Sequence, residues 1–321
     1  MRGAGSIAII GAGFVGATTA YSLLISGAAS EIILINRNRS IAHGHVEDLK
    51  DAAPFSHKTR IITGDFSDCG GADVVIVAVG VHQTPQTRSR LEDLEQSADI
   101  MRQVIAELMQ HDPRGVILIA SNPVDILAYA AWKWSGLPAN RVIGSGTSLD
   151  TARFRRRLAE RYGVAAENVH AYIIGEHGDS QVPVLSSAQI AGIHLEEFCQ
   201  EYGLPYQVSA LKAIGSETRT AGLEIQHAKG ATYYGISTAL TRIATAILGN
   251  EYAVLTVSSL APESMRLGSV SLSLPSVINR QGVARILPIS LNSDEADALH
   301  ASAGLLKRHL ASIELPAGMA A

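Results

Sequence analysis

The segment Gly11-Ala12-Gly13-Phe14-Val15-Gly16 carries the clearest structural signal in this chain. It follows the apolar run Ile7–Ile10, which is typical of a β-strand, and it opens a stretch with a helical pattern. In such a strand, turn and helix unit, the first glycine permits the tight turn, the second lets the backbone approach a pyrophosphate, and the third allows close helix–strand packing. The helix N-terminus then presents N–H groups to the phosphates. The segment therefore predicts a dinucleotide site built on Gly11, Gly13 and Gly16.

The first half of the chain repeats this alternation of short apolar runs and helical segments. The runs are continuous, as expected for parallel strands covered by helices on both faces. Further strands are expected at Glu31–Ile35, Arg60–Thr63, Asp73–Val79 and Gly115–Ala120, and a helix at Leu94–Met109. We predict an α/β fold with a doubly wound (Rossmann) parallel sheet over residues 1–144.

The second half of the chain is less regular. Helices are expected near Leu149–Tyr162, Tyr206–Lys229 and Asp294–Ser312, with short strands such as Val254–Ser258 and Val270–Leu274. This mixture predicts a mixed α/β substrate domain over residues 145–321. In the first half, the polar segment Val81–Glu92 beside a strand end predicts a lid over the ligand crevice.

The composition excludes several classes of protein. Of 321 residues, 47% are hydrophobic and 17% are charged, which is too apolar a balance for a disordered protein. The formal net charge of -4 argues against nucleic acid as a partner. Cys69 and Cys199 stand far apart without a nearby histidine, so we expect neither a disulfide framework nor a metal site. We also expect no signal peptide and no membrane span, and a reducing cytoplasm fits these features.

The end of the second predicted strand bears on the choice of cofactor. A carboxylate normally binds the adenosine ribose at this point, but here the residue is Asn36, followed by Arg37 and Arg39. An amide can bond a 2′-hydroxyl, yet it lacks the negative charge that repels a 2′-phosphate, and the arginines could neutralise one. NAD is the favoured cofactor and NADP stays an alternative.

Three motifs supply candidate catalytic residues. His177 stands between glycines after the apolar run Val169–Ile174, although a lone histidine in a loop is more often structural. Asp150 and Arg153 are three residues apart at a helix start and can share a side of the helix, which also suits an ordinary salt bridge. Asn122 follows the fifth strand on the crevice side, where it could instead be a helix N-cap before Pro123.

Together these motifs resemble the L-lactate/malate dehydrogenase family, and the nearest likeness is to its bacterial L-lactate dehydrogenases. The resemblance runs nearly end to end, from the glycine motif through Ser121–Asp125, Val142–Arg155, His170–Val182, Lys229–Ile236 and Pro275–Gly282. It implies a hydride transfer between NAD(H) and a small 2-oxo or 2-hydroxy acid. A dinucleotide-binding sensor or structural protein is the competing class, and it would not need such a complete catalytic set.

The resemblance also implies a role for each residue. His177 would be the general acid, and Asp150 would hold its imidazole in the right tautomer and charge state. Arg153 would anchor the substrate carboxylate through two parallel hydrogen bonds, and Arg90 would close over the substrate from the lid. Asn122 would orient the reacting carbonyl oxygen and the nicotinamide. The further cofactor contacts implied are Phe14, Val15, Asn36, Arg37 and Gly80.

The choice of hydroxy acid depends on the lid. The position that carries arginine in malate dehydrogenases and glutamine in lactate dehydrogenases is Gln83, which favours pyruvate because a second carboxylate would stay unpaired. The lid is one residue longer than usual and contains Arg88, which could accept oxaloacetate or replace Arg90. Thr232 resembles the residue that bounds the substrate side chain, so bulkier acids stay open.

Regulation and assembly follow from the same resemblance. Arg155 and His170 match positions that bind fructose 1,6-bisphosphate across a subunit interface in allosteric bacterial relatives. Facing cations repel one another until a bisphosphate neutralises them. The segment could also be retained simply as part of the fold. The chain begins without the N-terminal arm of the vertebrate enzymes, and a homotetramer is the expected assembly.

Overall fold

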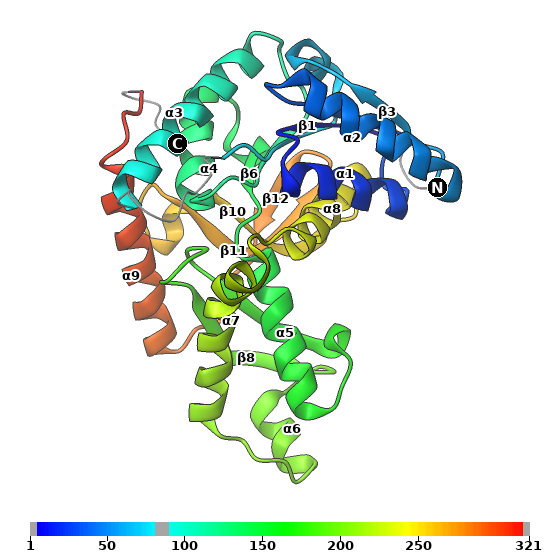
Figure 1. The fold of residues 1–321 in the computed structure, drawn as a ribbon. Helices are drawn as coiled ribbons and strands as arrows, with labels where there is room; N and C mark the ends of the chain where they lie inside the picture. Colours follow the sequence, from blue (N-terminus) through cyan, green and yellow to red (C-terminus); the bar gives the residue numbers. More distant parts are fainter. Residues whose placement is uncertain (1–4, 81–89, 317–321) are drawn as a thin grey trace.

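A computed structural model describes residues 5–80 and 90–316 of the chain (Figure 1). In this part of the chain, strands form one large and one small sheet. The strands of the large sheet are β1 (Ser6–Ile10), β2 (Glu31–Ile35), β3 (Arg60–Thr63), β4 (Val74–Val77), β5 (Val116–Ile119), β6 (Val142–Gly144), β10 (Ala253–Leu260), β11 (Ser271–Asn279) and β12 (Gly282–Ile286). The small sheet contains β7 (Val169–Ile174), β8 (Val182–Ile190) and β9 (Ile193–His194).

The α-helices of the described residues connect these strands. They are α1 (Phe14–Ser26), α2 (Arg39–Ala52), α3 (Arg90–Met109), α4 (Val124–Ser135), α5 (Ser148–Tyr162), α6 (Leu195–Glu201), α7 (Val208–Lys229), α8 (Tyr234–Leu248) and α9 (Ser293–Leu310). None of the described helices is long and apolar enough to span a membrane.

The large sheet has the order β12-β11-β10-β6-β5-β4-β1-β2-β3. From β6 to β3 all neighbours are parallel, which confirms the predicted doubly wound sheet. After β3 the chain crosses to β4 on the other side of β1, so the strand order reverses between β1 and β4. Ligands bind at such a reversal, beyond the carboxyl ends of the strands. The glycine segment after β1 and Asn122 after β5 both lie at these carboxyl ends.

Alternate residues of the parallel strands enter two different cores. Ile7 and Ile9 of β1 pack with residues of α1, α2 and α8, whereas Ala8 and Ile10 pack with residues of α3, α4 and α9. Both faces of the sheet are therefore covered, which explains why the strands are continuous apolar runs. A third core joins the small sheet to α5, α6 and α7, with Phe154 fully buried in it.

The last strands of the chain join the large sheet. The predicted strands Val254–Ser258 and Val270–Leu274 are parts of β10 and β11, and these extend the large sheet in antiparallel fashion beyond β6. The edge of β6 is thereby covered rather than left open. In Figure 1 the small sheet and α5 to α7 form the lower lobe, and α9 runs along the side of the molecule.

Most predicted elements are found close to their expected bounds. The strands β2 and β3 have the predicted ends, and β4 is shorter than Asp73–Val79. The helix α3 starts at Arg90, one turn before the predicted Leu94. Most of the predicted lid, residues 81–89, lies outside the described residues.

Candidate active site

The glycine segment forms a tight turn with open space above its centre. Gly11 has a φ of 108°, and a Cβ there would lie 2.4 Å from the carbonyl oxygen of Ala78. A Cβ on Gly16 would lie 1.8 Å from the carbonyl oxygen of Gly11. A Cβ on Gly13, the N-cap of α1, would meet nothing within 4 Å. The two outer glycines serve packing, and the open space at Gly13 fits a pyrophosphate beside the helix N-terminus.

Asn36 supports this turn from the end of β2. Its Oδ1 accepts the N–H of Ala12 at 3.2 Å, and its Nδ2 donates to the carbonyl of Asn38 at 3.1 Å. The amide thus holds the glycine segment against the second strand, where the predicted ribose contact lies. Arg37, the next residue, is exposed.

The start of α1 also contacts the far part of the chain. The ring of Phe14 is 66% exposed and stacks on that of Tyr233 at a centroid distance of 5.3 Å. The carbonyl of Val15 accepts the hydroxyl of Ser237 at 3.1 Å. These contacts fix the glycine segment relative to α8.

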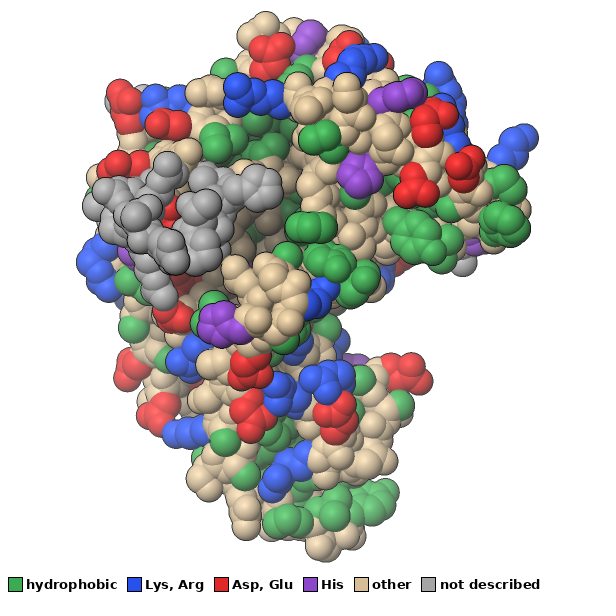
Figure 2. All heavy atoms as spheres, in the orientation of Figure 1, with side chains coloured by type: hydrophobic (Ala, Val, Ile, Leu, Met, Phe, Trp, Pro, Cys, Tyr) green, Lys and Arg blue, Asp and Glu red, His purple; other side chains and the backbone are tan. Residues whose placement is uncertain are grey.

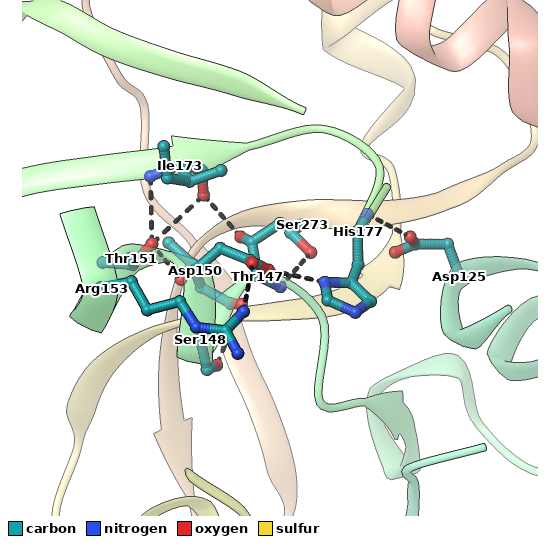
Figure 3. A network of polar contacts seen from close by, with 10 residues as sticks. Asp125, Thr147, Ser148, Asp150, Thr151, Arg153, Ile173, His177 and Ser273 are labelled. Atoms are coloured by element: carbon teal, nitrogen blue, oxygen red, sulfur yellow. Dashed lines mark hydrogen bonds and ion pairs between the residues drawn. The ribbon is translucent and has the colours of Figure 1, made fainter. Parts of the chain in front are cut away.

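The structure brings His177, Asp150 and Arg153 together (Figure 3). Asp150 Oδ2 lies 2.6 Å from His177 Nδ1, and Asp150 Oδ1 accepts a hydrogen bond from an Arg153 Nη at 3.3 Å. The carboxylate is 3% exposed and the imidazole 28% exposed. Because Nδ1 is bound to Asp150, Nε2 is the nitrogen left for proton transfer to a substrate. The salt bridge that the spacing of Asp150 and Arg153 suggested is present, and the same carboxylate holds the histidine.

Buried hydroxyl and backbone hydrogen bonds connect the start of α5, which carries Asp150, to β7, which leads to His177. Thr151, on α5, accepts the N–H of Ile173 at 3.0 Å through its hydroxyl. The N–H of Thr147 donates to the hydroxyl of Ser273 at 2.9 Å. The N–H of Gly175 donates to the carbonyl of Ser273 at 2.9 Å. The helix start that carries Asp150 is therefore tied to the strand end that carries His177.

Asp150 and His177 each stabilise the charged form of the other. Burial alone would lower the pKa of His177, but the charge and hydrogen bond of Asp150, with the charge of Asp125, raise it above the ordinary histidine value. Burial likewise opposes ionisation of Asp150, but His177 and Arg153 lower the pKa of that carboxyl below its ordinary value. An ionised Asp150 beside a protonated His177 is the arrangement that a proton donor near neutral pH requires.

A cavity of about 390 Å³ opens at His177. Two other predicted residues line it, Asn122 and Gly80. The N-cap of α4 is Pro123, so the suggestion that Asn122 caps this helix is wrong, and its amide is left for the cavity. Thr232 is half-buried in the link between α7 and α8. The cavity is also lined by residues to which the sequence analysis gave no role: Asp93, Leu94, Ser97, Pro123, Ile126, Glu176 and His309.

Asp125 is the neighbour of His177 that sequence reasoning missed. Its Oδ2 accepts the backbone N–H of His177 at 2.6 Å, and burial raises its pKa to about 6. The available signal was its place in the motif Ser121–Asp125, three residues after Asn122.

The predicted bisphosphate residues lie apart from this cavity. Arg155 Nε donates to the carbonyl of Ala171 at 2.8 Å, and the guanidinium stacks over the ring of Tyr172 at 5.0 Å. His170 is exposed on the same strand, two residues before Tyr172. Arg155 lines a separate cavity of about 730 Å³ between α5, α8 and β10.

Of the three predicted lid residues, Arg90 belongs to the described part of the chain. Gln83 and Arg88 lie outside the described residues. Arg90 is the first residue of α3, so its backbone begins the helix that carries Asp93 and Leu94 into the cavity wall.

Two family models together match almost the whole chain. The model described as the NAD binding domain of lactate/malate dehydrogenase matches residues 6–144. The model described as the alpha/beta C-terminal domain of lactate/malate dehydrogenase matches residues 147–315.

Individual relatives match over the same length. The L-lactate dehydrogenase of Thermus aquaticus is 45% identical over 301 residues, covering 94% of this chain and 97% of that protein. That of Bacillus caldolyticus is 44% identical over 311 residues, covering 97% and 98%. The crystal structure of a minor L-lactate dehydrogenase from Enterococcus mundtii matches with a TM-score of 0.94 at 37% identity, covering 98% of this chain and 99% of that one.

Proposed function

The chain belongs to the lactate/malate dehydrogenase family, and from this we propose that it interconverts pyruvate and L-lactate with NAD(H). The observation that carries the proposal is the bonded group of His177, Asp150 and Arg153, whose histidine lines the same cavity as Asn122 and Gly80. A sensor or structural protein that only binds the dinucleotide needs neither a proton donor nor a carboxylate anchor, so this group favours an enzyme.

His177 is the proposed proton donor in pyruvate reduction. NADH, when bound, supplies a hydride to the carbonyl carbon, and His177 Nε2 gives its proton to the carbonyl oxygen, so pyruvate, NADH and one proton become L-lactate and NAD⁺. Asp150 holds the ring through Nδ1 and stabilises its charged form. In lactate oxidation the neutral imidazole takes the proton back.

Arg153 is the proposed anchor for the substrate carboxylate. A guanidinium can form two parallel hydrogen bonds to a carboxylate, which fixes the position of the carbonyl relative to His177. Gly222 on α7 is a neighbour of this guanidinium, because a Cβ there would lie 3.9 Å from an Arg153 Nη. Asn122 and Arg90 are proposed to orient and polarise the carbonyl oxygen.

Pyruvate is the proposed substrate because Gln83 offers no positive charge to a second carboxylate. The names of the curated relatives support the same choice. Oxaloacetate, through Arg88, and bulkier 2-oxo acids, beside Thr232, are the alternatives that the experiment below must separate.

NAD is the proposed cofactor in preference to NADP. The chain carries the family's NAD-binding domain, and the proposed contacts with the cofactor are Gly11, Gly13, Phe14, Val15, Gly16, Asn36, Arg37, Gly80 and Asn122. The amide of Asn36 is engaged with the glycine segment, which supports a place beside the ribose. The absence of a carboxylate at this position leaves NADP as the alternative.

Assembly and regulation form a further part of the proposal. We infer a homotetramer in which fructose 1,6-bisphosphate binds near Arg155 and His170. His170 lies on β7, and Arg155 stacks over Tyr172 of the same strand. The cavity beside Arg155 is lined by exposed side chains such as Tyr234 of α8 and Val254 of β10. The free cysteines Cys69 and Cys199 support a location in the reducing cytoplasm.

The test is a comparison of kcat/KM for pyruvate and oxaloacetate, first with NADH and then with NADPH. We expect pyruvate to be preferred by at least about a hundredfold, because a buried unpaired carboxylate is costly. Preference for oxaloacetate would overturn the substrate assignment. If NADPH supports turnover no better than about a thousandth as well as NADH, the NADP alternative is excluded.

A further inference from the structure

Asp125 is a buried carboxylate in direct contact with the backbone of His177. It lies in the first turn of α4, is 2% exposed, and accepts the His177 N–H at 2.6 Å through Oδ2. Figure 3 shows it on the side of the histidine opposite to Asp150. His177 therefore lies between two carboxylates, one bound to its ring and the other to its backbone.

The contact with the His177 N–H does not by itself require a carboxylate at position 125, because a neutral amide could accept the same hydrogen bond. An ionised carboxylate is costly to bury without full hydrogen bonding. Its Oδ1 and the hydroxyl of Ser258 are both buried, and neither makes a hydrogen bond of good geometry within the described part of the chain. Burial raises the pKa of Asp125 to about 6, against the opposing effects of Ser258 and His177. Asp125 thus changes its charge in the pH range in which a histidine also titrates.

Other ionisable groups surround this pair. From α5 come Asp150 and Arg153, and Glu176 precedes His177 in the chain and raises the pKa of Asp125 by its charge. Asp93 of α3 and His309 of α9 line the same cavity as His177. Burial lowers the pKa of His177, Asp150 and then Asp125 raise it, and Arg153 lowers it. Asp125 is therefore the second carboxylate that favours the protonated imidazole.

We propose that Asp125 is a positioning residue for the reaction: its carboxylate fixes the backbone of His177, and its negative charge helps the imidazole to keep the proton that it delivers. This inference rests on the proposed function, in which His177 Nε2 protonates the substrate oxygen. Loss of the charge would let the imidazole release its proton at a lower pH. As the pH rises, the rate of pyruvate reduction would then begin to fall at a lower pH. The rate of lactate oxidation, which needs the neutral imidazole, would begin to rise at a lower pH.

The first test is the substitution Asp125→Asn, which keeps an oxygen for the His177 N–H but removes the charge. In D125N we expect the alkaline limb of kcat/KM for pyruvate to move to lower pH by at least about half a unit, with the affinity for NADH unchanged. Asp125→Ala removes the acceptor as well, so it should lose about tenfold more in kcat than D125N. An alkaline limb of D125N that coincides with that of the unchanged protein overturns the proposal.

The matched control is Glu295→Gln, another buried carboxylate changed to its amide. Glu295 Oε1 accepts the backbone N–H groups of Leu185 and Ser186 at 2.9 and 3.0 Å, and it belongs to the cap of α9. If a purely structural effect were responsible, E295Q and D125N would behave alike. We expect a changed pH profile in D125N alone.

A measurement without turnover separates this inference from the proposed function, and it also serves if D125N does not fold. In the unchanged protein with isotopically labelled histidine, the ring signals of His177 should titrate in two steps, one of them near the pKa of about 6 of Asp125. A single step overturns the inference whatever substrate the enzyme prefers. Absence of pyruvate reduction with two steps present would overturn the function and leave the coupling of Asp125 to His177 intact.

Discussion

Asp150 serves two partners at once. One oxygen faces the imidazole of His177 and the other the guanidinium of Arg153, so a single carboxylate sets the distance between the proposed proton donor and the proposed carboxylate anchor. Orientation of this kind is worth several kcal/mol in well-placed reactions, with a ceiling of roughly 7–11 kcal/mol. The position of the His177 imidazole is therefore tied to that of the Arg153 guanidinium.

At this scale we predict that His177→Asn binds NADH normally but loses most turnover. An asparagine cannot donate the proton, and loss of general acid catalysis typically costs about 10²- to 10⁴-fold in rate. The measurements are kcat for pyruvate reduction and the Kd of NADH from fluorescence titration. His194→Asn, at an exposed histidine, is the control and should match the unchanged protein. Near-normal turnover of the His177 variant would contradict the assignment.

At the scale of single elements, the glycines of the turn between β1 and α1 have different surroundings. Gly16 is in contact with the carbonyl of Gly11, whereas Gly13 faces open space. The same substitution at these two positions should therefore have different consequences. A change at Gly16 must move the backbone of the turn, whereas a change at Gly13 would only narrow the space proposed for the cofactor.

We predict that Gly13→Ala weakens NADH binding about tenfold or more without loss of stability. Gly16→Ala should lower the free energy of unfolding by about 1–3 kcal/mol, because its Cβ cannot fit beside Gly11 without strain. The measurements are thermal unfolding and NADH titration. Gly71→Ala, where a Cβ meets nothing within 4 Å and which lies at the opposite edge of the sheet, is the control. Equal loss of stability in the Gly13 and Gly16 variants would refute this division.

Across the whole molecule, exposed hydrophobic side chains suggest that the described chain is one part of an assembly. They include Tyr21 and Ile25 on α1, Ile41 on α2 and Tyr234 on α8. Figure 2 shows hydrophobic side chains on the surface around α1. Apolar patches of this kind commonly mark interfaces between subunits.

We predict that millimolar fructose 1,6-bisphosphate shifts the chain toward the tetramer and lowers the KM for pyruvate. In the proposed tetramer Arg155 and His170 would face their symmetry mates, and the ligand would neutralise them. The measurements are light scattering after gel filtration and steady-state kinetics, with inorganic phosphate at equal ionic strength as the reference. Arg155→Gln should abolish the response, and Arg156→Gln, at a residue paired on the surface with Glu160, should retain it. No response in the unchanged protein would remove the regulatory proposal.

Much of the fold could be predicted from local patterns. The bounds of β2 and β3 and the turn at Gly11 to Gly16 depend on residues that are neighbours in the chain. Apolar runs and glycines report such local requirements directly. The motif around His177 could likewise be singled out, but its roles came from the resemblance and not from spacing.

What only the folded chain reveals are contacts between residues far apart in sequence. Asp125 meets His177 across 52 positions, and Thr147 meets Ser273 across 126. The attachment of β10 to β6, which places the late strands on the first sheet, is of the same kind. No local pattern specifies such pairs, because they depend on how helices and strands pack around the shared cores. The residue types at the site could therefore be predicted from the sequence. The contact of a second carboxylate, that of Asp125, with His177 depends on the packing of the folded chain.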